Sequence, residues 1–449
     1  MSFWNHFEPT ADAPWNLRRV VHLHRRAVFG VCWAEVQRDL NAGPQAAVSR
    51  LLDGTCRSAG TPDDFDGLAT TIGNSAVASG SAERLKAWWL YRCLFSPRPL
   101  EERMTLMWHN HFATSNLKVN NLRLMKQQNE TLRQHAFSPF GDLLHAMSHD
   151  PALLEWLDAP SNRAGMPNEN LARELMELFS LGIGNYSERD VKEAARALTG
   201  WTVRQGNFRA MQEVHDGDSK TILNQSGNWS GDDFVRILLE QNSCARRIAW
   251  RLTNEFCGEN AVTDAALDEL AGGLRKNHLD VRWGVETILR SALFFSDENI
   301  QSRVADPVSF LLIPLRALEC WRSPPSTLLL AEWLGRIGQD LFNPPNVGGW
   351  TGGRGWLSTR TVIARANYAT AITAGQLANP ERRLDMPAGM ADIPDPVERL
   401  RRLGDLLCGG MSAETVRAII EKSGLQSKPD DLPWHCISEF LTRPETQLH

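Results

Sequence analysis

The sequence predicts a mostly α-helical protein, and three observations lead to this prediction. Apolar residues recur every three or four positions through most of the 449-residue chain, which is the spacing of an amphipathic helix. Strict alternation of apolar and polar residues, which indicates a strand, is rare, and its best example is a short hairpin at residues 201–212. No repeat of fixed period is visible. We therefore expect one large multi-helical body with long irregular loops and at most a short β-hairpin.

Residues suited to helix termini mark where several of these helices begin. Pro97 and Pro99 precede two glutamates, and proline and acidic residues both favour the first turn of a helix. Ser187 with Asp190 forms a start of the capping-box type for the run at 191–198. Further helices are expected near residues 33–53, 121–148, 168–181, 232–256, 262–273, 281–294, 306–321, 325–339, 358–377, 395–408 and 412–423.

Irregular segments interrupt the helices and suggest how the chain is divided. Residues 57–82 are rich in small and polar residues and predict a flexible loop, while residues 199–230 form a long polar excursion of the kind that often carries function. Residues 342–356 read FNPPNVGGWTGGRGW, a composition that requires unusual backbone angles or close approach. We expect a helical body over residues 1–378, followed by a linker and a small C-terminal helical segment over residues 379–449.

The overall charge argues against one class of partner. Lysine and arginine number 48 and aspartate and glutamate number 53, so the formal net charge is −5. Domains that bind nucleic acid usually carry a basic surface that neutralises phosphates. We therefore expect no nucleic-acid partner.

The chain also lacks the sequence marks of export and of membrane insertion. Its first 15 residues contain no basic and apolar signal-peptide pattern. No apolar run approaches the roughly 18 residues of a membrane span. Eight scattered cysteines without a CxxC pair indicate buried, reduced thiols. Together these features predict a cytoplasmic protein without a membrane span.

Tryptophan is the one residue type that stands out, with 16 Trp against 3 Tyr. Indole rings stack on sugars and cations, but they also fill protein cores. Several tryptophans lie at helix-periodic, core-like positions. Trp201, Trp350 and Trp356 instead follow glycines in irregular segments, so these three are candidates for stacking on a ligand.

The first candidate for a chemical site is the segment Trp108-His109-Asn110-His111. On a helix, positions i and i+2 point about 200° apart, so both imidazoles can bind one metal ion only if the helix ends here. The following residues Thr114 to Asn116 suggest such an end. The alternative is one buried, hydrogen-bonded histidine and one exposed histidine.

The second candidate is the segment at residues 167–179. Asn170, Glu174 and Glu177 share one helical stripe, and Glu169, Arg173 and Glu177 share a second stripe beside it. Inward-facing carboxylates on helices build metal and acid–base sites in helical proteins. A salt-bridge network between Arg173 and the glutamates on a solvated face is the alternative.

The third candidate lies within the polar excursion. His215, Asp216 and Lys220 fall within six residues, where they could supply a ligand, a base or an anion contact, or could form a simple Asp-Gly turn with a solvated lysine. A further pair, His145 and His149, has i, i+4 spacing on one helix face. The residues between them lack the glutamate of a zinc-protease motif, so a metalloprotease is not indicated.

Several segments together resemble a large bacterial family known as domain of unknown function 1800 (DUF1800). They are RRAVFG (25–30), WHNHFATSN (108–116), the QN…LRQHAF run (128–137), DPALLEWLD (150–158), the long run at 167–201, HDGDSKTIL (215–223) and FNPPNVGGWTGGRGWLST (342–359). The resemblance covers about residues 20–370 and fades over the last 70 or so. The family's members are often exported and encoded beside sulfatase-like proteins, which implies work on the envelope or on polysaccharides.

The resemblance and the residue chemistry together predict a metal-dependent enzyme, with hydrolysis as the default reaction. The expected metal ligands are His109, His111, Glu169 and Glu174, and the ion is Zn, Mn or Fe. The expected catalytic groups are Glu174, Glu177, His215 and Asp216. The expected substrate contacts are Asn110, Asn170, Arg173, Lys220, Trp201, Trp350 and Trp356.

Two alternatives remain open from the sequence. One is a non-catalytic factor that binds a glycan or a protein through the Trp- and Gly-rich loops, with a polysaccharide or a sulfatase-like protein as its partner. The other is a metal-free glycosidase that uses a carboxylate pair among Glu169, Glu174 and Glu177.

Overall fold

The computed structural model describes residues 2–57, 60–322, 324–377, 386–423 and 434–449, and helices dominate this part of the chain. The N-terminal helices are α1 (Leu17–Ala27), α2 (Trp33–Ala42), α3 (Pro44–Leu52), α4 (Phe65–Ala78), α5 (Ala82–Phe95), α6 (Pro99–His111), α7 (Asn116–Val119), α8 (Leu122–Gln134), α9 (Phe140–Ser148), α10 (Pro151–Trp156), α11 (Asn170–Glu174) and α12 (Glu188–Ala197). A π-helical turn, η2 (Leu175–Ser180), continues α11 directly.

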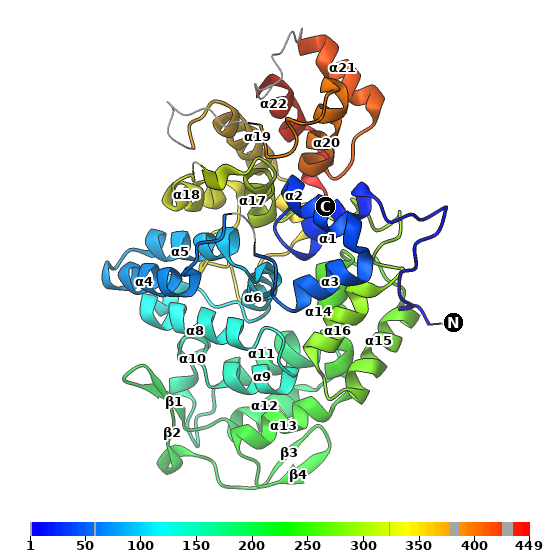
Figure 1. Cartoon of the computed structure of the whole chain (residues 1–449). Helices are drawn as coiled ribbons and strands as arrows, with labels where there is room; N and C mark the ends of the chain where they lie inside the picture. Colours follow the sequence, from blue (N-terminus) through cyan, green and yellow to red (C-terminus); the bar gives the residue numbers. More distant parts are fainter. Residues whose placement is uncertain (1, 58–59, 323, 378–385, 424–433) are drawn as a thin grey trace.

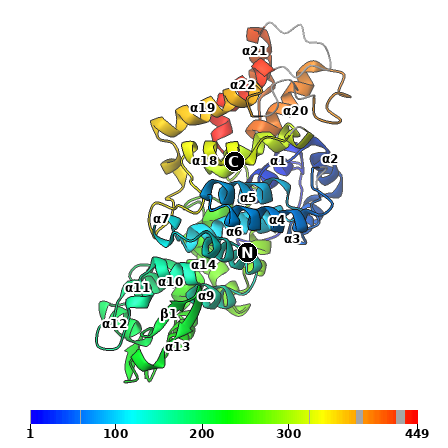
Figure 2. The ribbon, with the colours of Figure 1, turned by 90° about the vertical axis from the view of Figure 1, so that its left-hand side faces the viewer.

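The remaining helices follow the polar excursion. They are α13 (Gly231–Glu240), α14 (Asn242–Phe256), α15 (Asp264–Lys276), α16 (Val281–Arg290), α17 (Pro307–Ala317), α18 (Thr327–Ile337), α19 (Thr359–Thr373), α20 (Pro396–Cys408), α21 (Ala413–Ser423) and α22 (Trp434–Thr442). The prediction of a mostly α-helical fold is confirmed. Figure 2 shows that the molecule is longer than it is wide, with α21 at one end and the helix α13 with strand β1 at the other.

The polar excursion contains the described β-structure. Strands β1 (Trp201–Arg204) and β2 (Asn207–Ala210) pair in antiparallel register, which confirms the expected hairpin. Gln205 and Gly206 between them both have positive φ, the geometry that suits a two-residue hairpin turn. A second, unexpected hairpin joins β3 (Lys220–Ile222) to β4 (Gln225–Gly227).

The expected flexible loop at residues 57–82 is corrected by the structure, because most of it forms α4. Asp64 caps this helix by accepting from the backbone N–H of Gly67. A Cβ atom at Gly73 would lie only 2.7 Å from Nε1 of Trp88, so the small residues that resembled a linker instead allow close packing against α5. Residues 58–59 lie outside the described part.

Several expected helices are divided by backbone breaks that periodicity does not reveal. The run at 33–53 is split at Gly43, whose φ is +84° and which precedes the first residue of α3, a proline. The run at 121–148 is split at residues 135–139. These breaks change the direction of the chain without changing the apolar period.

Two apolar clusters fill the interior. One lies around α6, α9 and α13–α16, and the other around α5 and α17–α22 (Figure 1). Trp15 and Trp156 pack against both clusters, and α6 supplies residues to both, so this helix joins the two halves. All eight cysteines are buried.

The C-terminal segment packs onto the first helix rather than standing apart from the body. Arg25 of α1 donates from Nη1 to the carbonyl of Leu407 at 2.7 Å. The Nδ1 atom of His449 lies 2.9 Å from the carbonyl of Arg25, which can only accept, so this nitrogen donates. Residues 378–385 of the expected linker lie outside the described part.

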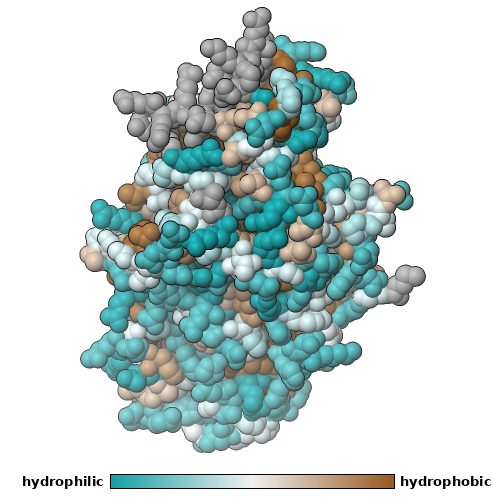
Figure 3. All heavy atoms as spheres, viewed as in Figure 1, coloured by the Kyte–Doolittle hydropathy of each residue, from teal (hydrophilic) through white to brown (hydrophobic). Residues whose placement is uncertain are grey.

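The surface in Figure 3 is mostly hydrophilic, with scattered apolar side chains. Among the described residues, no helix is long and apolar enough to cross a lipid bilayer.

Candidate functional site

The two histidines at the end of α6 point into different parts of the core. His109 lies among the rings of Trp89, Phe342 and Trp350, at centroid distances of 5.1, 5.7 and 5.8 Å. Burial lowers the pKa of His109 to about 3, so its ring is neutral. His111 packs against Phe179 instead and donates from Nε2 to that residue's carbonyl at 3.0 Å.

The expected metal ligands are therefore not brought together. His109 and His111 diverge as the helical geometry requires, because α6 stays helical through His111. Among the described residues, one set of three histidine or carboxylate side chains lies close enough together to share a metal ion. That set includes none of His109, His111, Glu169 and Glu174.

The stripe that contains Glu169 and Arg173 forms a salt-bridge network at the surface. Arg173 lies 2.9 Å from Glu169 Oε2 and 2.7 Å from Glu188 Oε1. Asn170 donates to Asp158 at 3.4 Å. This arrangement matches the alternative interpretation of a salt-bridge network on a solvated face, since each of these groups is bound to a neighbouring side chain at the surface.

The stripe of Asn170, Glu174 and Glu177 is more unusual because it crosses from α11 into the π-helical turn. The hydroxyl of Tyr186 donates to Oε2 of Glu177. Burial, and then the nearby charge of Glu177, raise the pKa of the Glu174 carboxyl. Arg247 donates to the carbonyl of Leu178 at 3.0 Å, a backbone group inside the π-helix. Single π-turns are often found at functional sites, and this one carries Glu177 three residues after Glu174 of α11 on the same helix face.

The polar residues of the excursion tie it to the end of α12. Arg196 donates two hydrogen bonds to the carboxylate of Asp216, at 2.7 and 3.1 Å, and these lower the pKa of that carboxyl. The ammonium of Lys220 is buried and donates to the carbonyl of Asp218 at 2.9 Å. His215 donates from Nδ1 to the carbonyl of Thr199 at 3.0 Å. In the described structure these three groups hold the loop in shape.

The three candidate stacking tryptophans are largely buried. Trp201, Trp350 and Trp356 are 5, 8 and 6% exposed, which leaves little ring face for a ligand. Asn110 holds the glycine-rich loop by accepting from the backbone N–H of Trp350 at 2.7 Å. A Cβ atom at Gly349 would lie 2.2 Å from Oδ1 of Asn110, so only glycine fits beside this amide.

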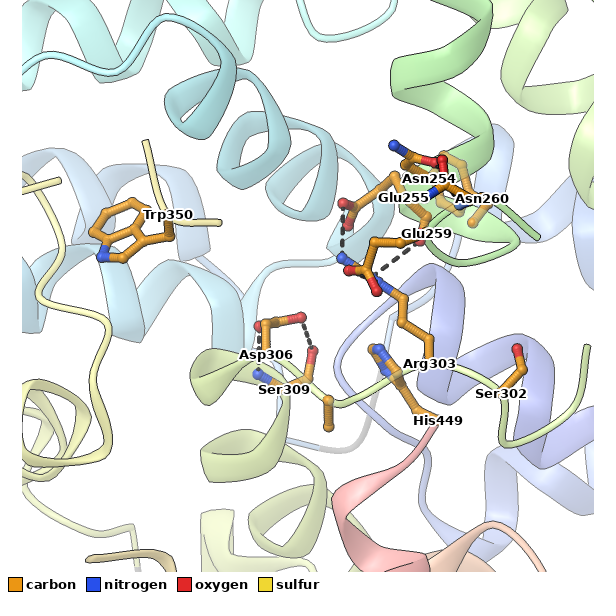
Figure 4. Close-up of polar contacts among 12 residues, drawn as sticks. Asn254, Glu255, Glu259, Asn260, Ser302, Arg303, Asp306, Ser309, Trp350 and His449 are labelled. Atoms are coloured by element: carbon orange, nitrogen blue, oxygen red, sulfur yellow. Dashed lines mark hydrogen bonds and ion pairs between the residues drawn. The ribbon is translucent and has the colours of Figure 1, made fainter. Parts of the chain in front are cut away.

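A buried charge cluster lies between α6, α14 and α17 (Figure 4), and the sequence reasoning did not single it out. Arg103 of α6 lies 2.7 Å from Glu255 and 2.7 Å from Asp306. Arg303 lies 3.2 Å from Glu255 and 4.0 Å from Glu259 at the cluster's outer side. Arg103, the segment at residues 255–259 and the segment at residues 303–306 are more than 40 positions apart in the sequence, so no local motif marks the cluster.

Charge compensation keeps this cluster ionised. The guanidinium groups of Arg103 and Arg303 outweigh burial and lower the pKa of Asp306 to about 2. The same two arginines lower the pKa of Glu255. Both carboxyl groups are therefore held in the ionised form, so the cluster suits structural support better than acid–base catalysis.

A different set of residues has the geometry of a metal site. His145 of α9, His149 at the end of α9 and Asp232 of α13 place one ligand atom each within 4.8 Å of one another. Oδ1 of Asp232 lies 3.4 Å from Nε2 of His145 and 3.0 Å from Nε2 of His149. Two donor atoms on a tetrahedral ion, each about 2.1 Å from it, lie about 3.4 Å apart, so these spacings fit a shared ion.

The hairpin of the excursion forms one wall of this metal-type cluster. The ring of His149 lies 4.7 Å from Trp201 of β1 and 4.1 Å from Phe208 of β2, measured between centroids. His145 and Asp232 are 56 and 60% exposed, so the cluster opens to solvent on the other side. The i, i+4 spacing of the histidines was visible in the sequence. The third ligand, Asp232, could not be recognised from the sequence, because it lies on a separate helix, α13.

Comparisons with known proteins identify the family. A family model described as "Protein of unknown function (DUF1800)" matches residues 22–448, nearly the whole chain. The match includes the C-terminal segment, where the sequence resemblance faded. No curated protein and no solved structure matches the chain.

Proposed function

The chain belongs to the DUF1800 family, whose description names no function, and we propose that it is a metal-dependent enzyme whose divalent ion is bound by His145, His149 and Asp232. The observation that carries this proposal is the convergence of two imidazole nitrogens and one carboxylate oxygen within 4.8 Å. These ligands replace His109, His111, Glu169 and Glu174 in the metal hypothesis. Two histidines with one carboxylate suit Zn, Mn or Fe.

The number of ligands favours catalysis over a structural role. Structural zinc sites are closed by four protein ligands, whereas catalytic sites use three and leave a position for water or substrate. His145 and Asp232 lie on the solvent side of the cluster, where such a position is accessible. A bound divalent ion lowers the pKa of its water toward neutrality, so hydrolysis is the reaction we propose.

Asp142 is the general base that we propose for this reaction. It is exposed and lies three residues before His145 on α9. Positions i and i+3 on a helix lie about 5–6 Å apart between Cβ atoms, so this carboxylate can reach a water on the ion without being a ligand itself. It would supply the role that the missing glutamate fills in zinc-protease motifs.

The binding-factor alternative has less support. It depended on indole rings presented by glycine-rich loops, and Trp201, Trp350 and Trp356 are almost fully buried. Trp201 instead packs on His149, where it shields one side of the proposed metal site.

Metal binding is tested on full-length, tag-free protein that has been stripped of metal. Isothermal titration with Zn, Mn and Fe(II) is expected to give one saturable site per chain. His149→Ala and Asp232→Asn should each weaken binding by at least about tenfold, because each removes one of three ligands. His6→Ala, an exposed histidine outside the cluster, is the matched control and should bind as wild type. Equal binding by all four proteins would overturn the assignment.

Hydrolysis is tested separately, with chromogenic phosphate, sulfate and carboxylate esters and with chromogenic glycosides. We expect metal-dependent turnover of one of these substrate classes that Asp142→Asn lowers while leaving metal affinity unchanged. Metal-independent turnover, or turnover unaffected by His149→Ala, would count against the enzymatic part of the proposal.

A further inference from the structure

We infer that a second site, separate from the proposed metal site, binds a small organic molecule through its phosphate or sulfate ester group. This site is a hollow of about 760 Å³ between the turn after the π-helix, the start of α14 and the end of α15. We call it the basic hollow. It is lined by Leu181, Gly182, Ile183, Asn185, Asn242, Ser243, Ala245, Arg246, Arg247, Trp250, Asp268, Ala271, Gly272, Arg275 and Lys276.

The basic hollow carries positive charge without matching negative charge. Of its four cationic side chains, Arg246 is neutralised by Asp264 and Asp268, at 2.6 and 2.7 Å. Arg247, Arg275 and Lys276 have no carboxylate within ion-pair distance in the part of the chain that the structure describes. Three uncompensated cations around one hollow favour a multiply charged anion over a neutral ligand.

Two of these cations are held in place by the backbone. Arg275 donates from Nη1 to the carbonyl of Leu239 at 2.7 Å, beside the end of α13. Arg247 donates to the carbonyl of Leu178 and lies over the ring of Trp250, with its guanidinium carbon 4.6 Å from the ring centroid. Anchored guanidinium groups lose little further freedom when an anion binds, which strengthens the interaction.

The start of α14 adds to the positive electrostatic potential of the basic hollow. Asn242 and Ser243, the first two residues of this 15-residue helix, line the hollow. The N-cap residue Gln241 makes no side-chain capping bond, and its amide donates to the carbonyl of Ile237 at 2.9 Å instead. The first backbone N–H groups of α14 are therefore not capped by a side chain and can contribute to anion binding together with the three cations.

The size and lining of the hollow indicate more than a bare ion. A volume of 760 Å³ is within the range of about 300–1,000 Å³ for small-molecule sites. Leu181, Ala271 and Trp250 supply apolar surface beside the cations, and Ile183 is 81% exposed at the edge. A tetrahedral oxyanion esterified to a compact organic group matches this combination of charge and apolar wall.

The hollow is independent of the proposed metal site. Asp232 lies at the start of α13, whereas Arg275 contacts the end of that helix. A ten-residue helix is about 15 Å long, so the two sites are separated by about that distance. Metal binding and anion binding can therefore succeed or fail separately.

The test uses metal-stripped, full-length protein and four probes: inorganic phosphate, inorganic sulfate, glucose 6-phosphate and glucose 6-sulfate, with glucose as the neutral comparison. Binding is measured by calorimetry and by thermal shift at constant ionic strength. We expect saturable binding of at least one ester, tighter than its inorganic ion, and none of glucose. The two esters distinguish phosphate from sulfate recognition.

Charge variants assign the binding to the hollow. Lys276→Glu is expected to raise the dissociation constant at least about tenfold, because it reverses one charge in the site. Lys192→Glu makes the same charge change at an exposed lysine outside the lining and should bind as wild type. Arg247→Gln provides a second variant, and His149→Ala should retain anion binding. Failure of the wild type to bind any probe saturably, or unchanged binding by both Lys276→Glu and Arg247→Gln, would overturn the inference.

Discussion

Asp306 is a buried carboxylate that links α6 to the start of α17. It accepts from Arg103 at 2.7 Å and caps α17 by accepting from the backbone N–H of Ser309 at 3.0 Å. Its arginine partners come from α6 and from the segment before α17. No spacing rule could have found this contact, because a charge on a buried helix face looks like any surface charge until its partner is known.

We predict that Asp306→Asn lowers the free energy of unfolding by about 3–5 kcal/mol, since it leaves buried arginine charge uncompensated. Urea unfolding at neutral pH measures the change. The pKa of Asp306 is lowered to about 2 from 3.8, so its stabilising contribution is present above pH 3.8 and is lost as the pH falls toward 2. A loss of less than 1 kcal/mol would contradict a supporting role for this cluster.

Asp150 shows the opposite sign of coupling to pH. It is buried and accepts at Oδ1 from Gln128 at 2.7 Å and from the backbone N–H of Leu153 at 2.9 Å, and no lysine, arginine or histidine among the described residues forms an ion pair with it. Burial raises its pKa to about 6 from 3.8. The folded protein therefore holds this proton more tightly than the unfolded chain does, and stability contributed by the neutral form is lost as the pH rises from 3.8 to 6.

Asp150→Asn is expected to remove this loss, because an asparagine oxygen can accept both hydrogen bonds without ionising. The free energy of unfolding is measured at pH 4 and pH 7 for both proteins. Because all other titratable groups are the same in the two, the difference between the two pH values should be smaller in the variant than in the wild type. An identical pH profile in the two proteins would show that Asp150 is not charged at neutral pH or that its charge is solvated.

Those helices and strands could be predicted whose position is determined by nearby residues, through apolar spacing, capping residues or turn residues. Periodicity and capping residues predicted α6, α12 and the first hairpin, because their apolar spacing and turn residues lie close together in the sequence. The small residues of α4 resembled a linker, since their role appears only when Trp88 packs against Gly73. The π-turn after α11 also escaped prediction, because no residue type specifies one.

Glycines at two helical positions test this packing argument. Gly73→Ala is expected to destabilise the protein by about 1–3 kcal/mol despite alanine's better helix propensity, because the added methyl would overlap Trp88. Gly272→Ala in α15 meets nothing within 4 Å and should stabilise by about 0.5–1 kcal/mol. Thermal unfolding compares the two. Equal shifts of the same sign would contradict the close packing of α4 on α5.

At the scale of the whole molecule, sequence reasoning placed a metal site at His109, His111, Glu169 and Glu174, which the fold does not bring together. His109 and His111 are only two positions apart in the sequence yet pack against Trp89 and Phe179 on different sides of α6. His145 and His149 gain their third partner only because α13 packs against α9 and places Asp232 beside them. Convergence of this kind depends on how the helices pack in three dimensions, and it cannot be predicted from the spacing of residues in one sequence.

The central claim is that His145, His149 and Asp232 hold a divalent ion, and anomalous X-ray diffraction tests it most directly. Crystals of the full chain grown with zinc are measured above and below the zinc absorption edge. We predict an anomalous peak about 2.0–2.2 Å from Nε2 of His145, Nε2 of His149 and Oδ1 of Asp232. Absence of a peak there at saturating zinc, or a peak at His109 or His111 instead, would contradict the assignment.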